Sequence, residues 1–407
     1  TLFDQATANM RGGIRAGVVQ PRELVEQVLP QLDAVLRPAA EDSIFWMPIV
    51  TMPDTISAQD RTRLTAEYKR RIESQIMPAY RALRGFLATE YMAAARASTG
   101  MQALPDGQAW YASVVRQSTA TTMSAEQLHA WGEQRTAELD DAITAVMKAN
   151  RIRGSKDKLR RTMASDKRFH YTDAQALLTH YRQIQQQVTV TLPTLFAPMP
   201  AGALEVTAVP ADRPMAAAAA YQPASPANGG TKQEGHPASV QINTSNLPSR
   251  LRWSAPASFL HEGIPGHHLQ LGMQQGLDAL PRFRRLGGDT AFIEGWGLYA
   301  ESLGDTLGVY QDPYAKIGYL QAALTRAARV VADTGLHTQG WDKAKAVRYL
   351  EDVAALPEAD ASAEVDRMLS QPGQALSAVL GEAAIITLRD RARAMQGDAF
   401  DLRSFHA

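Results

Sequence analysis

The chain has 407 residues and a formal net charge of zero, because 42 Lys and Arg balance 42 Asp and Glu. This balance excludes the strongly basic surface of a nucleic-acid-binding protein, and no apolar run approaches the roughly 18 residues of a transmembrane helix. Cysteine is absent, so disulfides, thiol nucleophiles and Cys-ligated zinc are excluded, and any metal must be held by His, Asp or Glu.

The first 190 residues predict a helical half. Pro21 fits the first position of a helix. Apolar residues spaced three or four apart predict a long helix over residues 60–96, with a kink at Pro78. Ser124 and Thr172 each begin the Ser/Thr-x-x-Gln pattern of a capping box, which predicts the start of a further helix at both places.

The character of the sequence changes over residues 191–250. Prolines interrupt the helical pattern, and residues 204–209 alternate apolar and polar side chains as a strand does. Residues 216–221 and 238–243 are the expected partner strands, joined by a turn-rich segment over 223–230. We therefore expect a small antiparallel sheet that interrupts a helical protein.

Helices return in the C-terminal part, where helical patterns are found over residues 256–276, 290–307, 314–337, 342–355 and 374–396. The predicted fold is mainly α. Two helical halves, 1–190 and 251–407, pack around a central cleft with the small sheet of residues 191–250 at its edge, and together they form one catalytic unit.

Three of the nine histidines lie within eight residues, in the segment HEGIPGHH at 261–268. In zinc peptidases, two imidazoles on one helix face hold the metal, and a Glu beside the first His takes a proton from the attacking water. The two His then stand four residues apart, but here that position is Pro265. His267 at i+6 lies about 120° off the face of His261, and His268 at i+7 lies about 10.5 Å along a straight helix.

The helix must therefore deform within this segment. Two glycines and Pro265 between the histidines permit a bulge or a break. If two residues loop out, His267 takes the i+4 place and Glu262 stands beside the first ligand. His268 remains the alternative second ligand.

Two carboxylates on the predicted helix 290–307 can supply a third ligand. Glu294 stands next to Gly295 and Gly297, and such small residues allow a helix to approach a metal site closely. Glu301, seven residues on, lies on roughly the same face, where it can support a ligand. The aromatic residues of this helix also form an ordinary core stripe, which does not account for a Glu among them.

The next helix carries a polar stripe. Arg326, Arg329, Asp333 and His337 follow at i, i+3, i+7 and i+11, which places them on one face. Asp333 with His337 four residues later is a suitable pair for orienting an imidazole toward an oxyanion. A solvated face would explain the Arg and Asp residues, but for His337 we favour a catalytic role.

These segments resemble a bacterial family catalogued as "domain of unknown function 885", and the resemblance extends over nearly the whole chain. It rests on long motifs in a fixed order: HEGIPGHHLQ at 261–270, FIEGWGLYAE at 292–301, DTGLH at 333–337 and PGQAL at 372–376. Members are regarded as zinc metallopeptidases similar to the gluzincins, and they are often exported in Gram-negative bacteria. The family usually continues beyond Phe405-His406, which predicts that this chain is cut there.

The resemblance implies a role for each matching residue: zinc ligands at His261, His267 and Glu294, the general base at Glu262, and lining residues at His337 and Gln374. One position departs from the family. Ala378 stands where members usually have Tyr, which implies reduced or shifted activity if that Tyr contacts the substrate or the oxyanion.

We therefore predict a zinc-dependent peptidase that cleaves short peptides, in which Glu262 activates the attacking water and His337 stabilises the oxyanion. The expected substrate contacts are Tyr221, His268, Gln374 and Arg326. We predict a periplasmic or secreted protein whose leader is missing from this chain, which starts at Thr1, although a cytoplasmic location also fits. We expect no nucleic-acid partner.

Three alternatives stay open. The same metal ligands would serve a hydrolase of non-peptide amides or esters. A catalytically inactive binding protein would explain Ala378, although the intact Glu262 argues against it. A purely structural helical protein would bind no metal at all.

Overall fold

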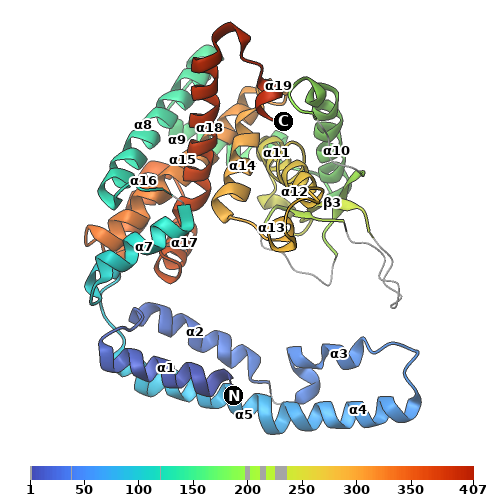
Figure 1. Cartoon of the computed structure of the whole chain (residues 1–407), viewed down its shortest axis with the longest axis vertical. Coiled ribbons are helices and arrows are strands. Elements are labelled where there is room, and N and C mark those ends of the chain that lie inside the picture. Colours follow the sequence, from blue (N-terminus) through green and yellow to red (C-terminus); the bar gives the residue numbers. More distant parts are fainter. Residues whose placement is uncertain (1, 38, 120, 198–201, 211–216, 225–235) are drawn as a thin grey trace.

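Helices dominate the computed structural model of the chain, and a small sheet interrupts them, which confirms the predicted fold class (Figure 1). The structure describes residues 2–37, 39–119, 121–197, 202–210, 217–224 and 236–407. Most of the predicted turn-rich segment 223–230 therefore lies outside the described residues, as does residue 216 of the predicted second strand. No helix that the structure describes is both long enough and apolar enough to cross a membrane.

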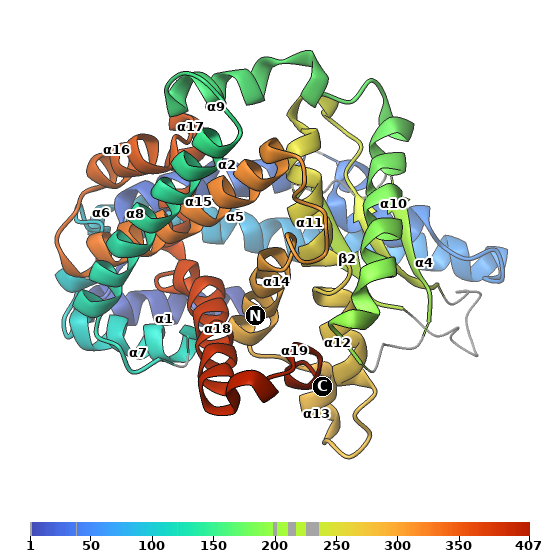
Figure 2. The same ribbon diagram turned by 90° about the horizontal axis from the view of Figure 1, so that it is seen from above.

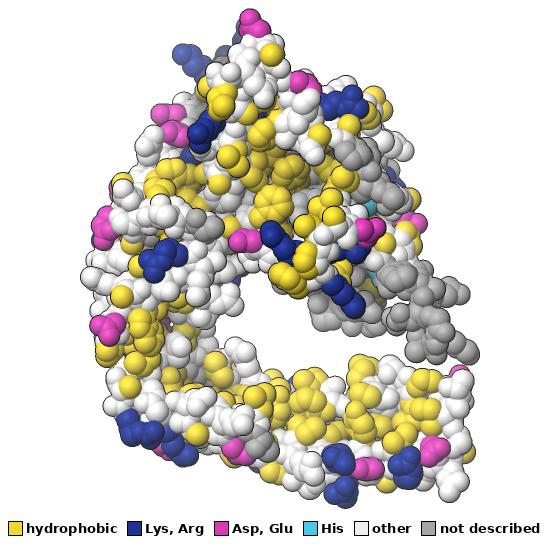
Figure 3. All heavy atoms as spheres, viewed as in Figure 1, with side chains coloured by type: hydrophobic (Ala, Val, Ile, Leu, Met, Phe, Trp, Pro, Cys, Tyr) yellow, Lys and Arg dark blue, Asp and Glu magenta, His cyan; other side chains and the backbone are white. Residues whose placement is uncertain are grey.

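The N-terminal helices form a layer of their own, made of α1 (Leu2–Ala16), α2 (Arg22–Val35), α3 (Met47–Val50), α4 (Ala58–Arg71), α5 (Met77–Phe86) and α6 (Met92–Ala94). A deep hollow separates much of this layer from the rest of the molecule (Figures 1 and 3). The layer has its own small apolar core, which includes Val25, Leu32, Phe86 and Tyr91.

Helices α4 to α6 follow one another almost without interruption, as the predicted helix 60–96 requires. Two π-helical turns, Ile72–Ile76 and Leu87–Tyr91, join them. Pro78 lies in the first turn of α5, directly after the first π-helical turn. The missing N–H of this proline thus falls where the hydrogen-bond ladder is already irregular.

The second group of helices is α7 (Gly107–Thr119), α8 (Ala125–Ala149), α9 (Lys156–Ser165) and α10 (Ala174–Thr191). The capping box of α8 is present, because the Ser124 hydroxyl accepts from the Gln127 N–H and the Gln127 side chain accepts from the Ser124 N–H. At α10 the prediction is off by one residue. Asp173, not Thr172, is the N-cap, and its carboxylate accepts from the Ala176 N–H at 2.7 Å. A carboxylate also suits the positive end of the helix dipole better than a hydroxyl does.

The sheet consists of β1 (Leu204–Ala208), β2 (Ala219–Gln222) and β3 (Ala238–Ile242), in the order β1-β3-β2. The predicted antiparallel sheet is corrected here. β2 pairs antiparallel with β3, but β1 pairs parallel with it. Alternation of side chains fixes the face of each residue but neither the neighbour nor the direction of a strand. The central place belongs to β3, whose residues are almost all buried.

The C-terminal helices are α11 (Ala255–Glu262), α12 (His267–Gln275), α13 (Arg282–Leu286), α14 (Thr290–Ser302), α15 (Pro313–Thr338), α16 (Lys343–Ala354), α17 (Glu358–Ser370), α18 (Ser377–Gln396) and α19 (Leu402–Phe405). The predicted helix 256–276 is thus two helices, and α17 was not predicted. The long α15 runs through the centre of the body (Figure 2). It packs against α8 and α16, while α14 packs against α18.

The hollow lies at a different place from the expected division near residue 190. Helices α8 and α10 pack directly on the C-terminal helices α15 and α11. One large apolar core extends from Leu139 through the sheet to Ile385. Residues 2–94 are therefore the part that stands apart, and the body that carries the histidine cluster begins after them.

Candidate metal centre

The histidine segment is broken into two helices at the place where glycine and proline are concentrated. Helix α11 ends at Glu262, and α12 begins at His267. The turn brings the imidazole rings of His261 and His267 together, with their centres 4.6 Å apart. Gly266 is required for this turn between α11 and α12, because a Cβ there would lie 1.9 Å from the carbonyl oxygen of His261.

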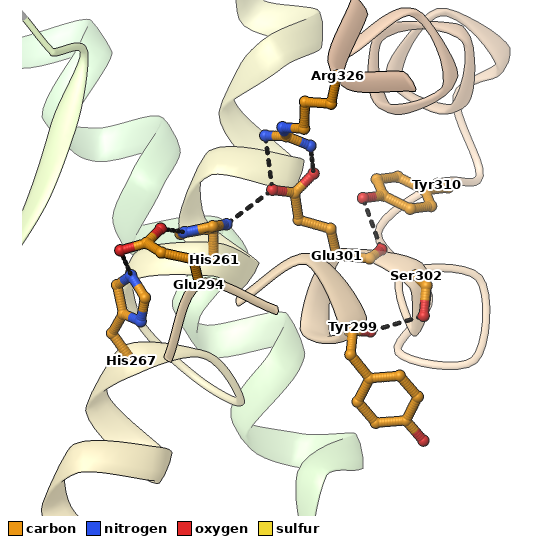
Figure 4. A network of polar contacts seen from close by, with 8 residues as sticks. All are labelled: His261, His267, Glu294, Tyr299, Glu301, Ser302, Tyr310 and Arg326. Atoms are coloured by element: carbon orange, nitrogen blue, oxygen red, sulfur yellow. Dashed lines mark hydrogen bonds and ion pairs between the residues drawn. The ribbon is translucent and has the colours of Figure 1, made fainter. Parts of the chain in front are cut away.

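Glu294 of α14 stands against both imidazoles. One carboxylate oxygen lies 3.3 Å from Nε2 of His261, and the other lies 3.8 Å from Nε2 of His267. Figure 4 shows the three side chains pointing toward one another. Two tetrahedral zinc ligands about 2.0–2.2 Å from the ion lie roughly 3.3–3.6 Å apart. The contact of Glu294 with His261 has this spacing, whereas the contact with His267 is longer and uses the other oxygen.

The Glu262 side chain belongs to the same cluster. One possible ligand atom from each of His261, Glu262 and His267 lies within 4.8 Å of the others. The Tyr221 N–H of strand β2 donates to the Glu262 carboxylate at 2.8 Å. Burial raises the pKa of Glu262, which makes the carboxylate a stronger base than an exposed one.

A carboxylate and a guanidinium fix the orientation of His261 from behind. Nδ1 of His261 lies 2.8 Å from Glu301, and both terminal nitrogens of Arg326 donate to the same carboxylate, at 2.8 and 2.9 Å. Glu301 is only 1% exposed. This contact leaves Nε2 of His261 to face Glu294 and His267, as a metal ligand must. His267 has no such support, since its Nδ1 is buried without a partner among the described residues.

Gly297 explains how α14 comes so close to His261. A Cβ at this position would lie 2.5 Å from Cε1 of the His261 ring. Such a contact is far below the ordinary van der Waals separation. Gly297, three residues after Glu294, is thus needed for the close approach of α14 to His261.

The two imidazoles have opposite electrostatic character. Burial lowers the pKa of His261, but its hydrogen bonds to Glu294 and Glu301 outweigh this and raise the pKa to about 9. Burial and the charge of His261 lower the pKa of His267 to about 4. Without a metal, His261 therefore holds a proton between two carboxylates, a place that a divalent cation can take over.

A cavity of about 470 Å³ opens beside this cluster. Its walls include the cluster residues His261, Glu262 and Glu294, and also several further side chains of the predicted site and its surroundings: Glu301, Arg326, Arg329, Glu364, Arg367, Gln374 and Ala378. Gln374 and Arg326, two of the expected substrate contacts, therefore line this cavity. Glu364 and Arg367 were missed because α17 was not predicted, although their i,i+3 charge pairing is a helix signal.

Tyr221 and His268 lie next to the cluster but are not among the lining residues of the cavity. The Tyr221 hydroxyl lies 3.3 Å from Nδ1 of His268. Tyr221 contacts the site through the hydrogen bond from its backbone to Glu262. His268 is therefore a neighbour of the cluster of His261, Glu262 and His267, and His267 is the histidine that faces Glu294.

His337 does not lie in the site, so the predicted oxyanion role is corrected. The ring is 1% exposed, and it does not line the cavity. Nδ1 accepts from the Met101 N–H at 3.2 Å, so Nε2 donates to the Met368 carbonyl at 3.1 Å. Burial lowers the pKa of His337 to about 4, so the ring is neutral. Asp333, its predicted partner, binds the Tyr111 hydroxyl and the Gly373 N–H instead.

The family model described as "Bacterial protein of unknown function (DUF885)" matches residues 1–407. A crystal structure described as "the putative lipoprotein from Colwellia psychrerythraea" is similar to the chain, with 26% identity, a TM-score of 0.87, and coverage of 99% of this chain and 70% of that one. A second structure, "a putative lipoprotein of unknown function from Shewanella oneidensis", shares the fold, with 18% identity, a TM-score of 0.71, and coverage of 95% and 70%. No curated protein matches the sequence. The chain belongs to the DUF885 family of bacterial proteins, as its motifs indicate.

Proposed function

We propose that this protein is a zinc-dependent peptidase that hydrolyses short peptides. One observation carries the proposal: His261, Glu262 and His267 each offer a possible ligand atom within 4.8 Å of the others, Glu294 stands against both imidazoles, and a cavity opens beside them. Zinc at this position would polarise the scissile carbonyl and make the attacking water more acidic.

The residues around the cavity account for the remaining parts of the reaction. Glu262 takes a proton from water and passes it to the leaving nitrogen as the C–N bond breaks, which yields a carboxylate and an amine. The Tyr221 N–H holds the Glu262 carboxylate in place through the hydrogen bond at 2.8 Å. The cavity volume of about 470 Å³ lies within the range of small-ligand sites, about 300–1,000 Å³, which favours short peptides over folded proteins.

Two variants test the metal and the base separately. His261→Ala should lose bound zinc, measured by elemental analysis, whereas His236→Ala at an exposed position should keep it. Glu262→Gln should retain zinc but lose cleavage of a mixed peptide library. Zinc-free wild-type protein, or full activity of Glu262→Gln, would refute the proposal. Cleavage of small amides without any peptide turnover would favour the non-peptide hydrolase.

Ala378 favours one second candidate, a binding protein without turnover. This residue lines the cavity, and a small side chain there leaves the substrate without a hydroxyl that Tyr would offer. Ala378→Tyr distinguishes the two cases. A large gain in peptide turnover would mean that the natural chain mainly binds, while a small or no gain supports the peptidase.

We also propose that the protein works outside the cytoplasm, in the periplasm or at a membrane surface facing it. Support comes from the two solved relatives, both described as lipoproteins. Fractionation of cells that express the full-length gene product tests this location, and recovery in the cytoplasmic fraction alone would contradict it.

A further inference from the structure

The cavity in front of the metal cluster also contains three arginines. Arg326 and Arg329 extend from α15, about one turn apart, and Arg367 extends from α17. Their carboxylate partners in the same cavity are Glu301 and Glu364. Glu262 and Glu294 line the cavity as well, but among the described residues they form no ion pair with these arginines, so three guanidinium groups share two carboxylate partners.

The incompletely paired guanidinium groups are those of Arg329 and Arg367, and not that of Arg326. Both terminal nitrogens of Arg326 donate to Glu301. Arg329 and Arg367 share one oxygen of Glu364, Arg329 at 2.7 Å. Nε of Arg329 is buried and has no hydrogen-bond partner among the described residues. A buried donor without a partner is costly, and the Arg329 side chain is 27% exposed and lines the cavity, so a ligand there can reach its guanidinium group.

The chemistry of such a ligand follows from the guanidinium fork. Arginine binds carboxylates through two parallel hydrogen bonds, and these charge-assisted bonds are among the strongest in proteins. A peptide whose scissile bond lies at the metal cluster brings two kinds of carboxylate into this cavity. One is its own C-terminal carboxylate, and the other is an acidic side chain. Every peptide has the first, so it suits a fixed binding site better.

We propose that Arg329 and Arg367 bind the C-terminal carboxylate of the substrate, so that the protein removes residues from the C-terminal ends of short peptides. This proposal rests on the proposed peptidase function. Arg367 is half-exposed and also lines a second pocket, between α2 and α17. The guanidinium group of Arg367 is therefore accessible, and a ligand carboxylate in the cavity can reach it.

The test compares Ala-Ala-Phe as the free acid with its C-terminal amide. Binding to zinc-loaded Glu262→Gln protein is measured by calorimetry, which needs no turnover. The free acid should bind about 10- to 100-fold more tightly than the amide. Arg329→Gln should remove this preference, and Arg348→Gln at an exposed position of α16 should keep it.

A second variant and a cleavage assay make each outcome of the experiment decisive. Arg367→Gln changes a half-exposed residue, so it decides the matter if Arg329→Gln fails to fold by circular dichroism. Equal binding of acid and amide overturns the proposal, as does a preference that follows an internal Glu in an amidated peptide. If the wild-type protein cleaved acid and amide alike at internal bonds, the carboxylate proposal would be wrong and the peptidase proposal would stand. Preferential binding of the acid without any cleavage would support the carboxylate site but contradict the peptidase function.

Discussion

Nδ1 of His261 lies 2.8 Å from the carboxylate of Glu301, and Arg326 donates two hydrogen bonds to the same carboxylate. This chain of three side chains crosses three helices, α11, α14 and α15. It fixes the His261 ring without using the nitrogen that faces Glu294. The position of His261, a proposed metal ligand, is therefore determined by packing between helices and not by α11 alone.

Glu301→Gln should weaken zinc binding by about 10- to 100-fold, as loss of the partner of a ligating His commonly does. The amide cannot accept two hydrogen bonds from Arg326 and one from His261 as a carboxylate does. Zinc affinity is measured by competition with a chelator. Glu73→Gln, on an exposed turn of the N-terminal layer, is the matched control. Equal affinities in the two variants would show that Glu301 has no influence on the site.

Gly297→Ala should both destabilise the protein and weaken zinc binding, because the new methyl group would overlap the His261 ring. Overpacking of this kind costs about 1–3 kcal/mol, measured by urea unfolding. Gly85→Ala is the control, since a Cβ there meets nothing within 4 Å. The control should be neutral or slightly more stable, because Ala favours helix over Gly. A Gly297→Ala protein with normal zinc affinity would contradict the close contact.

His337→Ala should reduce stability by about 2–5 kcal/mol, because it leaves the Met101 N–H and the Met368 carbonyl without a partner and opens a cavity. Zinc affinity should remain as in the parent protein. His267→Ala should show the opposite pattern, with zinc binding lost. If His337→Ala abolished zinc binding in a folded protein, the separation of His337 from the site would be wrong.

Asp333 should make the protein less stable as the pH rises from 4 to 7. Burial raises the pKa of this carboxyl group to about 7, against 3.8 for the ordinary group. The folded state therefore holds the proton more tightly. Its contribution to the free energy of unfolding is fully present below pH 4 and is lost as the pH rises through 7, by no more than about 1.4 kcal/mol per pH unit.

Asp333→Asn removes this titration but keeps an oxygen for the Tyr111 hydroxyl. Urea unfolding of both proteins at several pH values gives the difference profile, in which other titrating groups cancel. The difference should change between pH 4 and 7 and stay flat above pH 8. Parallel profiles for the two proteins would mean that Asp333 does not titrate in this range.

The convergence of His261, His267 and Glu294 could be predicted because strong local signals surround them in the sequence. Gly263, Pro265 and Gly266 show where the helix must break, and Gly297 shows where α14 comes close. His337, in contrast, lies outside the site although its helix face predicted otherwise. Eleven residues after Arg326, it shares a helix face but lies about 16.5 Å further along the axis. Periodicity gives direction around a helix, whereas a site also requires position along it.

The order of the strands and the arginine-rich part of the cavity could not be predicted for a related reason. Alternation in residues 204–208 and 238–242 does not reveal which strand is central. Glu364 and Arg367 reach the cavity only because α17 packs against α15. Such long-range placements depend on the whole fold.

The break between α11 and α12 has a consequence for how the site forms. In a His-Glu motif on one continuous helix, both imidazoles are aligned as soon as that helix exists. Here His261 and His267 belong to separate helices, and the third ligand, Glu294, comes from yet another. No short fragment of the chain contains a preformed site. If the proposed site binds zinc, that binding reports on the integrity of the assembled body of the protein.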